Sequence, residues 1–116
     1  MPSLYTVANL AIFVGINGGY KHLRLYGVDH TYFDSLCVNE DNQVCTKIAH
    51  FYNDKEEELR PLRRSLDGKV YTMSEYLKMV MEVFRSHDIL YKYSKYMKVQ
   101  ILNCTKGSMI DSYERK

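Results

Sequence analysis

Residues 7–30 read VANLAIFVGINGGYKHLRLYGVDH, an apolar run that leads through two glycines into a segment of alternating residues. The run predicts a helix over residues 3–17, because Ser3 is a suitable N-cap and the glycine pair is typical of a C-cap. Apolar residues occupy almost every side of this helix, so we expect it to be widely buried. Residues 22–28 alternate between apolar and polar side chains and are bounded by glycines, which predicts a β-strand.

The stretch that follows has no clear period. Residues 29–53 contain Asp-Asn and Tyr/Phe clusters and are predicted to form a long loop, which in a compact domain is usually a functional lid or disordered. Residues 54–68 carry a run of charges and are predicted to form a solvated short helix or turn.

A second helix is predicted to begin at Thr72, which is a suitable N-cap with Glu75 as its capping-box partner. The helix that begins there is expected to reach about residue 86, and residues 87–97 form a further helix or an extension of this one. Residues 99–102 are apolar and β-prone, so they are predicted to form a second strand, followed by a turn.

This order of elements predicts an α/β fold. Two strands joined by a helical crossover are expected to be parallel, and a parallel sheet needs helices to cover it. The expected architecture is a partial Rossmann-like parallel sheet, flanked by helices and apparently lacking its N-terminal strands. Residues 1–116 are therefore expected to form a single domain or the C-terminal half of a larger one, and the free sheet edges favour a homo-oligomer.

Composition excludes several classes of protein. The 116 residues carry a formal net charge of only +2, which does not favour a nucleic-acid partner, and basic residues near the C-terminus are typical of a solvated helix face. The longest apolar run is too short to span a bilayer. An odd number of cysteines at no framework spacing indicates free thiols and a cytoplasmic location: Cys37, Cys45 and Cys104.

Polar residues follow both predicted strands. Residues 27–30 and 103–108 come directly after them, and ligands of open α/β sheets bind at the carboxyl ends of strands. Glycine, asparagine and hydroxyl residues there suit a backbone that approaches a phosphate or a sugar. Ordinary strand-exit turns remain the alternative at this point. No Walker A or Gly-x-Gly-x-x-Gly motif occurs, and the cysteines and histidines lack zinc-ribbon spacing, so no metal is expected.

Residues 7–30 resemble a recurring segment of bacterial sialyltransferases and of the related motility-accessory-factor and hydroxymethylpterin-pyrophosphokinase-like proteins. In these proteins a buried helix ends in a "lGyk" turn and a strand ends in "GvD". The sequence His-Phe-Tyr at residues 50–52 is similar to that group, and residues 103–111, NCTKGSMID, resemble its terminal "N-T-GS-ID" element. The resemblance covers most of the chain except residues 54–70.

The resemblance implies an inverting sugar-nucleotide transferase that needs no cofactor. His50 is then the general base that deprotonates the acceptor hydroxyl, and Tyr32 and Tyr52 hold the leaving phosphate. A histidine suits the role because its ordinary pKa is near 6.5. The other residues that the resemblance assigns to substrate binding follow the two strands: Asp29, His30, Asn103, Thr105 and Ser108. We expect one crevice to hold Asp29, Tyr32, His50, Tyr52, Asn103 and Ser108. For His22 and His87, a packing or surface role is favoured.

The partners implied are a nucleotide-sugar donor, such as CMP-sialic acid, and a glycan or glycolipid acceptor in polysaccharide biosynthesis. The chain would act in the cytoplasm, with peripheral contact at the inner face of the membrane. The isolated chain is expected to be catalytically silent. Two alternatives stay open: a non-catalytic α/β binding or assembly module, and a pterin pyrophosphokinase-like protein, which would require magnesium.

Overall fold

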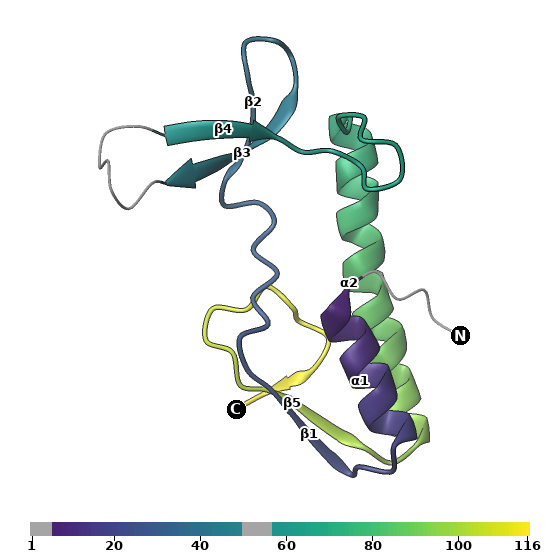
Figure 1. The fold of residues 1–116 in the computed structure, drawn as a ribbon. Helices are drawn as coiled ribbons and strands as arrows, with labels where there is room; N and C mark the ends of the chain where they lie inside the picture. Colours follow the sequence, from purple (N-terminus) through teal and green to yellow (C-terminus); the bar gives the residue numbers. More distant parts are fainter. Residues whose placement is uncertain (1–5, 50–56) are drawn as a thin grey trace. The chain divides into compact units, whose positions relative to one another are not determined.

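The computed structural model describes residues 6–49 and 57–116 (Figure 1). The chain divides into two compact units. Unit 1 comprises Met1–Thr31 and Val80–Lys116, and unit 2 comprises Tyr32–Met79. The long helix α2, Met73–Tyr96, begins in unit 2 and continues into unit 1.

The predicted first helix is present as α1, Val7–Asn17. It begins four residues later than expected, because Thr6 is its N-cap: the Thr6 hydroxyl accepts a hydrogen bond from the Asn9 backbone N–H at 3.2 Å. The proposed N-cap Ser3 lies outside the described residues. At the other end, the backbone N–H of Gly18 closes the helix by donating to the carbonyl of Val14.

The sheet of unit 1 is parallel, and the expected α/β class is confirmed. It contains β1 (His22–Leu25), β5 (Gln100–Asn103) and β6 (Glu114–Arg115) in the order β1-β5-β6. Leu23 lies opposite Ile101 in the register. The two-residue strand β6 was not predicted, because two residues are too few to show an alternating pattern.

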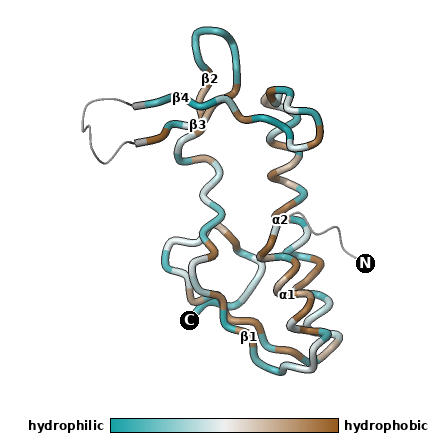
Figure 2. Tube along the Cα trace, in the orientation of Figure 1, coloured by the Kyte–Doolittle hydropathy of each residue, from teal (hydrophilic) through white to brown (hydrophobic). Residues whose placement is uncertain are grey.

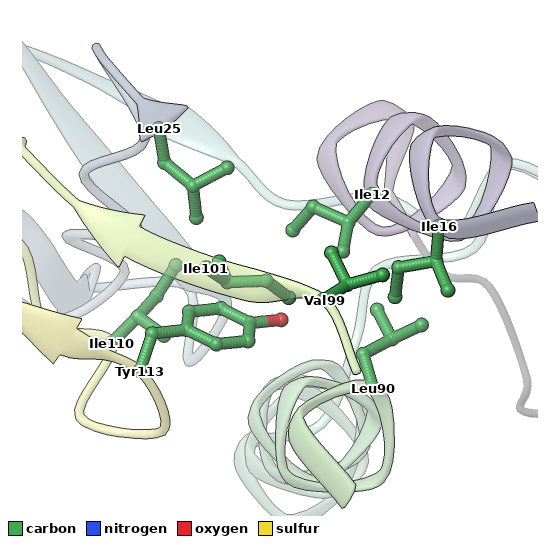
Figure 3. Packing of buried hydrophobic residues seen from close by; sticks show 8 residues of the cluster. All are labelled: Ile12, Ile16, Leu25, Leu90, Val99, Ile101, Ile110 and Tyr113. Carbon is green, nitrogen blue, oxygen red and sulfur yellow. The ribbon is translucent and has the colours of Figure 1, made fainter. Parts of the chain in front are cut away.

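The core of unit 1 lies between this sheet and the two helices. Figure 3 shows Ile12 and Ile16 of α1 and Leu90 of α2 meeting Val99 beside β5. Strand residues that point the other way are exposed, as His22, Arg24 and Gln100 show. The described helices therefore cover one face of the sheet. The buried apolar residues of the cluster are Ile12, Ile16, Leu25, Leu90, Val99, Ile101, Ile110 and Tyr113.

The predicted start of the second helix is confirmed by its capping box. The backbone N–H of Thr72 donates to the Glu75 carboxylate at 2.9 Å, and the backbone N–H of Glu75 donates to the Thr72 hydroxyl at 3.2 Å. Of the two alternatives for residues 87–97, the extension is confirmed, because α2 runs unbroken to Tyr96. Where the extension begins, Ser86 and His87 are buried, so tertiary packing stabilises helical turns that polar composition alone does not favour.

Unit 2 corrects two sequence-based expectations. Residues 29–53 were predicted to form a loop and residues 54–68 a solvated helix or turn, but strands of an antiparallel sheet lie in both segments. The sheet has the order β2-β3-β4, formed by β2 (Leu36–Val38), β3 (Val44–Ala49) and β4 (Glu57–Pro61).

A tight turn joins the paired strands β2 and β3 of unit 2. The turn between β2 and β3 is closed by Asn39, whose carboxamide oxygen accepts from the Gln43 backbone N–H at 2.8 Å, and Asn42 has a positive φ of 62°. Figure 2 shows that this turn is hydrophilic, whereas apolar residues recur along α1. No helix in the described part of the chain is both long enough and apolar enough to cross a membrane.

Candidate functional site at the carboxyl edge of the parallel sheet

The segments that follow β1 and β5 lie side by side. The Val28 backbone N–H donates to the Thr105 hydroxyl at 3.1 Å, and the Ser108 hydroxyl donates to the Val28 carbonyl at 2.7 Å. The Met109 backbone N–H donates to the carbonyl of Asp29 at 2.9 Å. Since the strands are parallel, both segments emerge at one edge of the sheet, which we call the carboxyl edge.

Three of the polar residues predicted to bind substrate help to build this edge. Asn103 is 1% exposed, and its amide donates to the Ser108 hydroxyl at 3.0 Å while its oxygen accepts from the Thr105 backbone N–H at 3.1 Å. The Thr105 hydroxyl donates to the carbonyl of Leu25 at 3.3 Å. These side chains therefore hold the two strand exits together, and they are themselves buried.

Asp29 and His30 lie at the outer part of the edge. Asp29 is exposed and His30 is half-buried. His30 has a φ of 53°, and Gly27 has a φ of 69°, so the chain turns sharply where it leaves β1. The His30 ring stands edge-on to Phe84 of α2, with centroids 6.1 Å apart. Burial lowers the pKa of His30 and so favours its neutral form, and the neighbouring Asp29 carboxylate opposes that shift.

His30 is attached to a buried polar network that sequence reasoning missed. Its Nε2 lies 3.0 Å from Nε2 of His87, which is fully buried in α2. The same His87 atom lies 3.1 Å from Nδ2 of Asn9, and His87 Nδ1 lies 2.7 Å from the hydroxyl of Tyr113. The network thus joins α1, the β1 exit, α2 and the C-terminal segment.

The positions of the protons on His87 can be deduced from the hydrogen bonds of Asn9. The Thr6 hydroxyl donates to the Asn9 oxygen at 2.7 Å, so the Asn9 amide nitrogen faces His87 and can only donate to it. His87 Nε2 is therefore an acceptor, and Nδ1–H donates to Tyr113. Burial, followed by the nearby His30, lowers the pKa of His87 to about 4, while Asp88 acts in the opposite direction.

Three further residues were predicted for the site: Tyr32, His50 and Tyr52. Tyr32 belongs to unit 2, where its carbonyl accepts from the Tyr76 hydroxyl at 3.4 Å, and burial raises the pKa of the Tyr32 phenol. His50 and Tyr52, the predicted base and phosphate holder, lie outside the described residues. The carboxyl edge therefore gathers Asp29, His30, Asn103, Thr105 and Ser108.

Other features of the described residues do not indicate a competing site. No group of three or more histidine, cysteine, aspartate or glutamate side chains among residues 6–49 and 57–116 could hold a metal ion. Unit 2 has an open hollow beside the start of α2, and none of the residues predicted for the site lines it. Its lining comprises Val38, Asn42, Gln43, Val44, Val70, Tyr71, Thr72 and Met73.

Comparison with known proteins adds no family to this description. No family model, no curated protein and no solved structure matches the chain. The molecule is thus defined by its class: an α/β protein whose parallel sheet ends in a hydrogen-bonded polar edge, with a second unit built on an antiparallel sheet.

Proposed function

We propose that this protein is part of a glycosyltransferase that transfers a sugar, with sialic acid as the first candidate, from an activated nucleotide to a glycan or glycolipid acceptor. The carboxyl edge of unit 1 would bind the nucleotide end of the donor. The single observation that supports this most is the joining of the β1 and β5 exits at one edge, the position where open parallel sheets bind their ligands.

The exposed groups at this edge suit a nucleotide-sugar. The Asp29 carboxylate can accept hydrogen bonds from sugar hydroxyls, and the neutral imidazole of His30 can exchange hydrogen bonds with a ligand. Asn103, Thr105 and Ser108 would act by keeping both exits in place rather than by contacting the donor directly. This division of roles refines the substrate-binding assignment that the resemblance implies.

The chemical step is assigned to His50, Tyr32 and Tyr52, as the resemblance implies. In the proposed mechanism His50 removes the proton from the acceptor hydroxyl, and the hydroxyls of Tyr32 and Tyr52 stabilise the departing phosphate. Transfer with inversion then needs a base and hydrogen-bond donors that stabilise the leaving phosphate, which is why no metal is invoked. Contact of the protein with the inner face of the membrane would bring it to a glycolipid acceptor.

Two other functions are distinguished by simple observations. A pterin pyrophosphokinase-like protein would need magnesium to transfer pyrophosphate, so its ligand binding should depend on added metal. A non-catalytic binding or assembly module would bind neither CMP nor CMP-sialic acid at the carboxyl edge.

We expect the isolated chain to bind CMP in the presence of a chelator, with NMR shift changes at residues 27–31 and 103–109. Replacing the exposed carboxylate in Asp29→Asn should weaken binding by about tenfold, the effect of one lost charged hydrogen bond. Asp111→Asn is the matched control, because Asp111 is an exposed aspartate in the same unit. Binding that requires magnesium would favour the pyrophosphokinase-like alternative, and no shift change at millimolar CMP would refute the proposal.

A further inference from the structure

The outer side of α1 is apolar although it is exposed. Val7 is 84%, Leu10 48% and Val14 58% exposed, and Ala11 between them is exposed as well. We call these four residues the α1 stripe. The helix contains no charged residue at all. A helix that is apolar all round is normally buried all round, so the stripe indicates a surface that another molecule covers.

The strand beneath α1 is also incomplete on its outer side. β1 is the edge strand of the described sheet. The carbonyls of Lys21 and Leu25 accept hydrogen bonds from β5, and backbone groups alternate in direction along a strand. The backbone N–H and C=O groups of His22 and Arg24 therefore point away from β5, where a further strand would pair.

One member of the α1 stripe, Ala11, lies on the same side of unit 1 as the β1 edge. α1 lies over β1, since a Cβ atom on Gly15 would come within 3.1 Å of the Leu23 side chain. Its opposite side faces α2, as Phe13 stacks on Tyr93 with centroids 5.8 Å apart. At 3.6 residues per turn, Ala11 points almost directly away from Asn9 and Phe13, and hence away from α2.

We propose that this side of unit 1 is a two-fold interface between two copies of the chain. The β1 strands pair antiparallel across the axis and extend the sheet to six strands, while the two α1 stripes pack on each other. Such a contact is isologous, because each copy offers the same surface. The stripe is uncharged, so it meets its own copy without electrostatic repulsion, and the small Ala11 lets the helices approach closely.

The charge of the surface favours a second copy over other occupants. A helix that lies on an anionic membrane carries lysines or arginines along its polar face, and α1 has none. A nucleic-acid contact needs cations against the phosphates. A free strand edge beside an uncharged stripe suits instead a partner with the same two features.

The strand register follows from the outward groups. His22 of one copy pairs with Arg24 of the other, which places Leu23 opposite Leu23 on the core side of the sheet. A register centred on Arg24 would set Arg24 against Arg24, and like charges directly opposite are destabilising. In the register centred on Leu23, His22 of each copy pairs with Arg24 of the other, and the contact between the two Arg24 side chains is avoided.

The expected dimer is weak. An 11-residue helix is about 16 Å long and a four-residue strand about 13 Å, so the contact is smaller than the roughly 800 Å² per partner of a standard interface. Sedimentation equilibrium of the whole chain should therefore show a mass that rises from 13.7 kDa toward twice that value between micromolar and millimolar concentrations.

Two variants test the two halves of the interface. Ala11→Glu places like charges across the axis, and Arg24→Pro removes an outward N–H at a position where an edge strand tolerates proline. Each should raise the dimer dissociation constant at least about tenfold, with the circular dichroism spectrum unchanged. Leu66→Glu is the control, because Leu66 is 99% exposed in unit 2, and it should dimerise like the wild type.

Hydrogen exchange identifies the strand contact. The amide protons of His22 and Arg24 should become protected as the concentration rises, because they bond to the second copy. A monomer at every concentration would overturn the proposal. A dimer in which both variants associate normally, or in which neither amide gains protection, would overturn it as well.

Discussion

Acidification from pH 6.5 to about 4 is expected to lower the free energy of unfolding of unit 1 by about 3 kcal/mol through His87 alone. The pKa of His87 is lowered to about 4 in the folded protein, since the ring is fully buried and lies beside His30. Between these pH values His87 binds a proton in the unfolded chain but stays unprotonated in the folded chain. The stabilisation is complete above pH 6.5 and is lost as the pH falls toward 4.

The measurement is urea unfolding at a series of pH values, followed by the signals of unit 1 residues. The pH dependence of the free energy of unfolding gives the number of protons taken up on unfolding. Over this range, that number should be smaller by nearly one in His87→Gln than in the wild type, whatever the stability of the variant at neutral pH. His22→Gln is the matched control, because His22 is exposed on β1. Equal slopes in the wild type and in His87→Gln would show that His87 is not held neutral.

Asn103→Ala is expected to destabilise unit 1 by about 2–3 kcal/mol. The side chain of Asn103 is 1% exposed, and its removal leaves the buried backbone N–H of Thr105 without its 3.1 Å acceptor. The Ser108 hydroxyl also loses the 3.0 Å hydrogen bond that the Asn103 amide donates. A buried polar group that loses its partner costs its full desolvation, which is more than the average worth of a hydrogen bond.

Gln100→Ala provides the comparison on the same strand. Gln100 is exposed, and its side chain bonds to the exposed His22 at 3.1 Å, so this change should cost less than about 0.5 kcal/mol. Thermal and urea unfolding measure both variants. Because Asn103 holds the two strand exits together, Asn103→Ala should also broaden the NMR signals of residues 27–30. A loss of stability no greater in Asn103→Ala than in Gln100→Ala would contradict the role assigned to Asn103.

Several elements could be predicted because their signals are local. The apolar run before the glycine pair indicated α1, and the alternation of Leu23 and Leu25 indicated β1. Thr72 and Glu75 form a capping box only three residues apart, so the start of α2 was readable as well. The parallel pairing of β1 with β5 followed from the order of elements, and with it the meeting of the strand exits.

The antiparallel sheet of unit 2 was not predictable in the same way. β2 has three residues, too few to show a period, and β4 is rich in charge. Such strands are stabilised by the neighbours with which they pair: β3 aligns Thr46 with Leu36 on one side and with Arg60 on the other. Taken alone, the short β2 and the charged β4 resemble loops, and only their pairing with β3 makes them strands.

The sequence by itself determined the α/β class, the apolar α1, the two main parallel strands and the polar segments that follow them, because these depend on residues close together in the chain. Only the tertiary structure decided which polar residues are buried and joined. His87 meets Asn9 across 78 positions and Tyr113 across 26, and no local pattern marks such pairs. Burial is the physical reason, since it lowers the pKa of His87 and keeps this helix residue neutral and hydrogen-bonded beside His30.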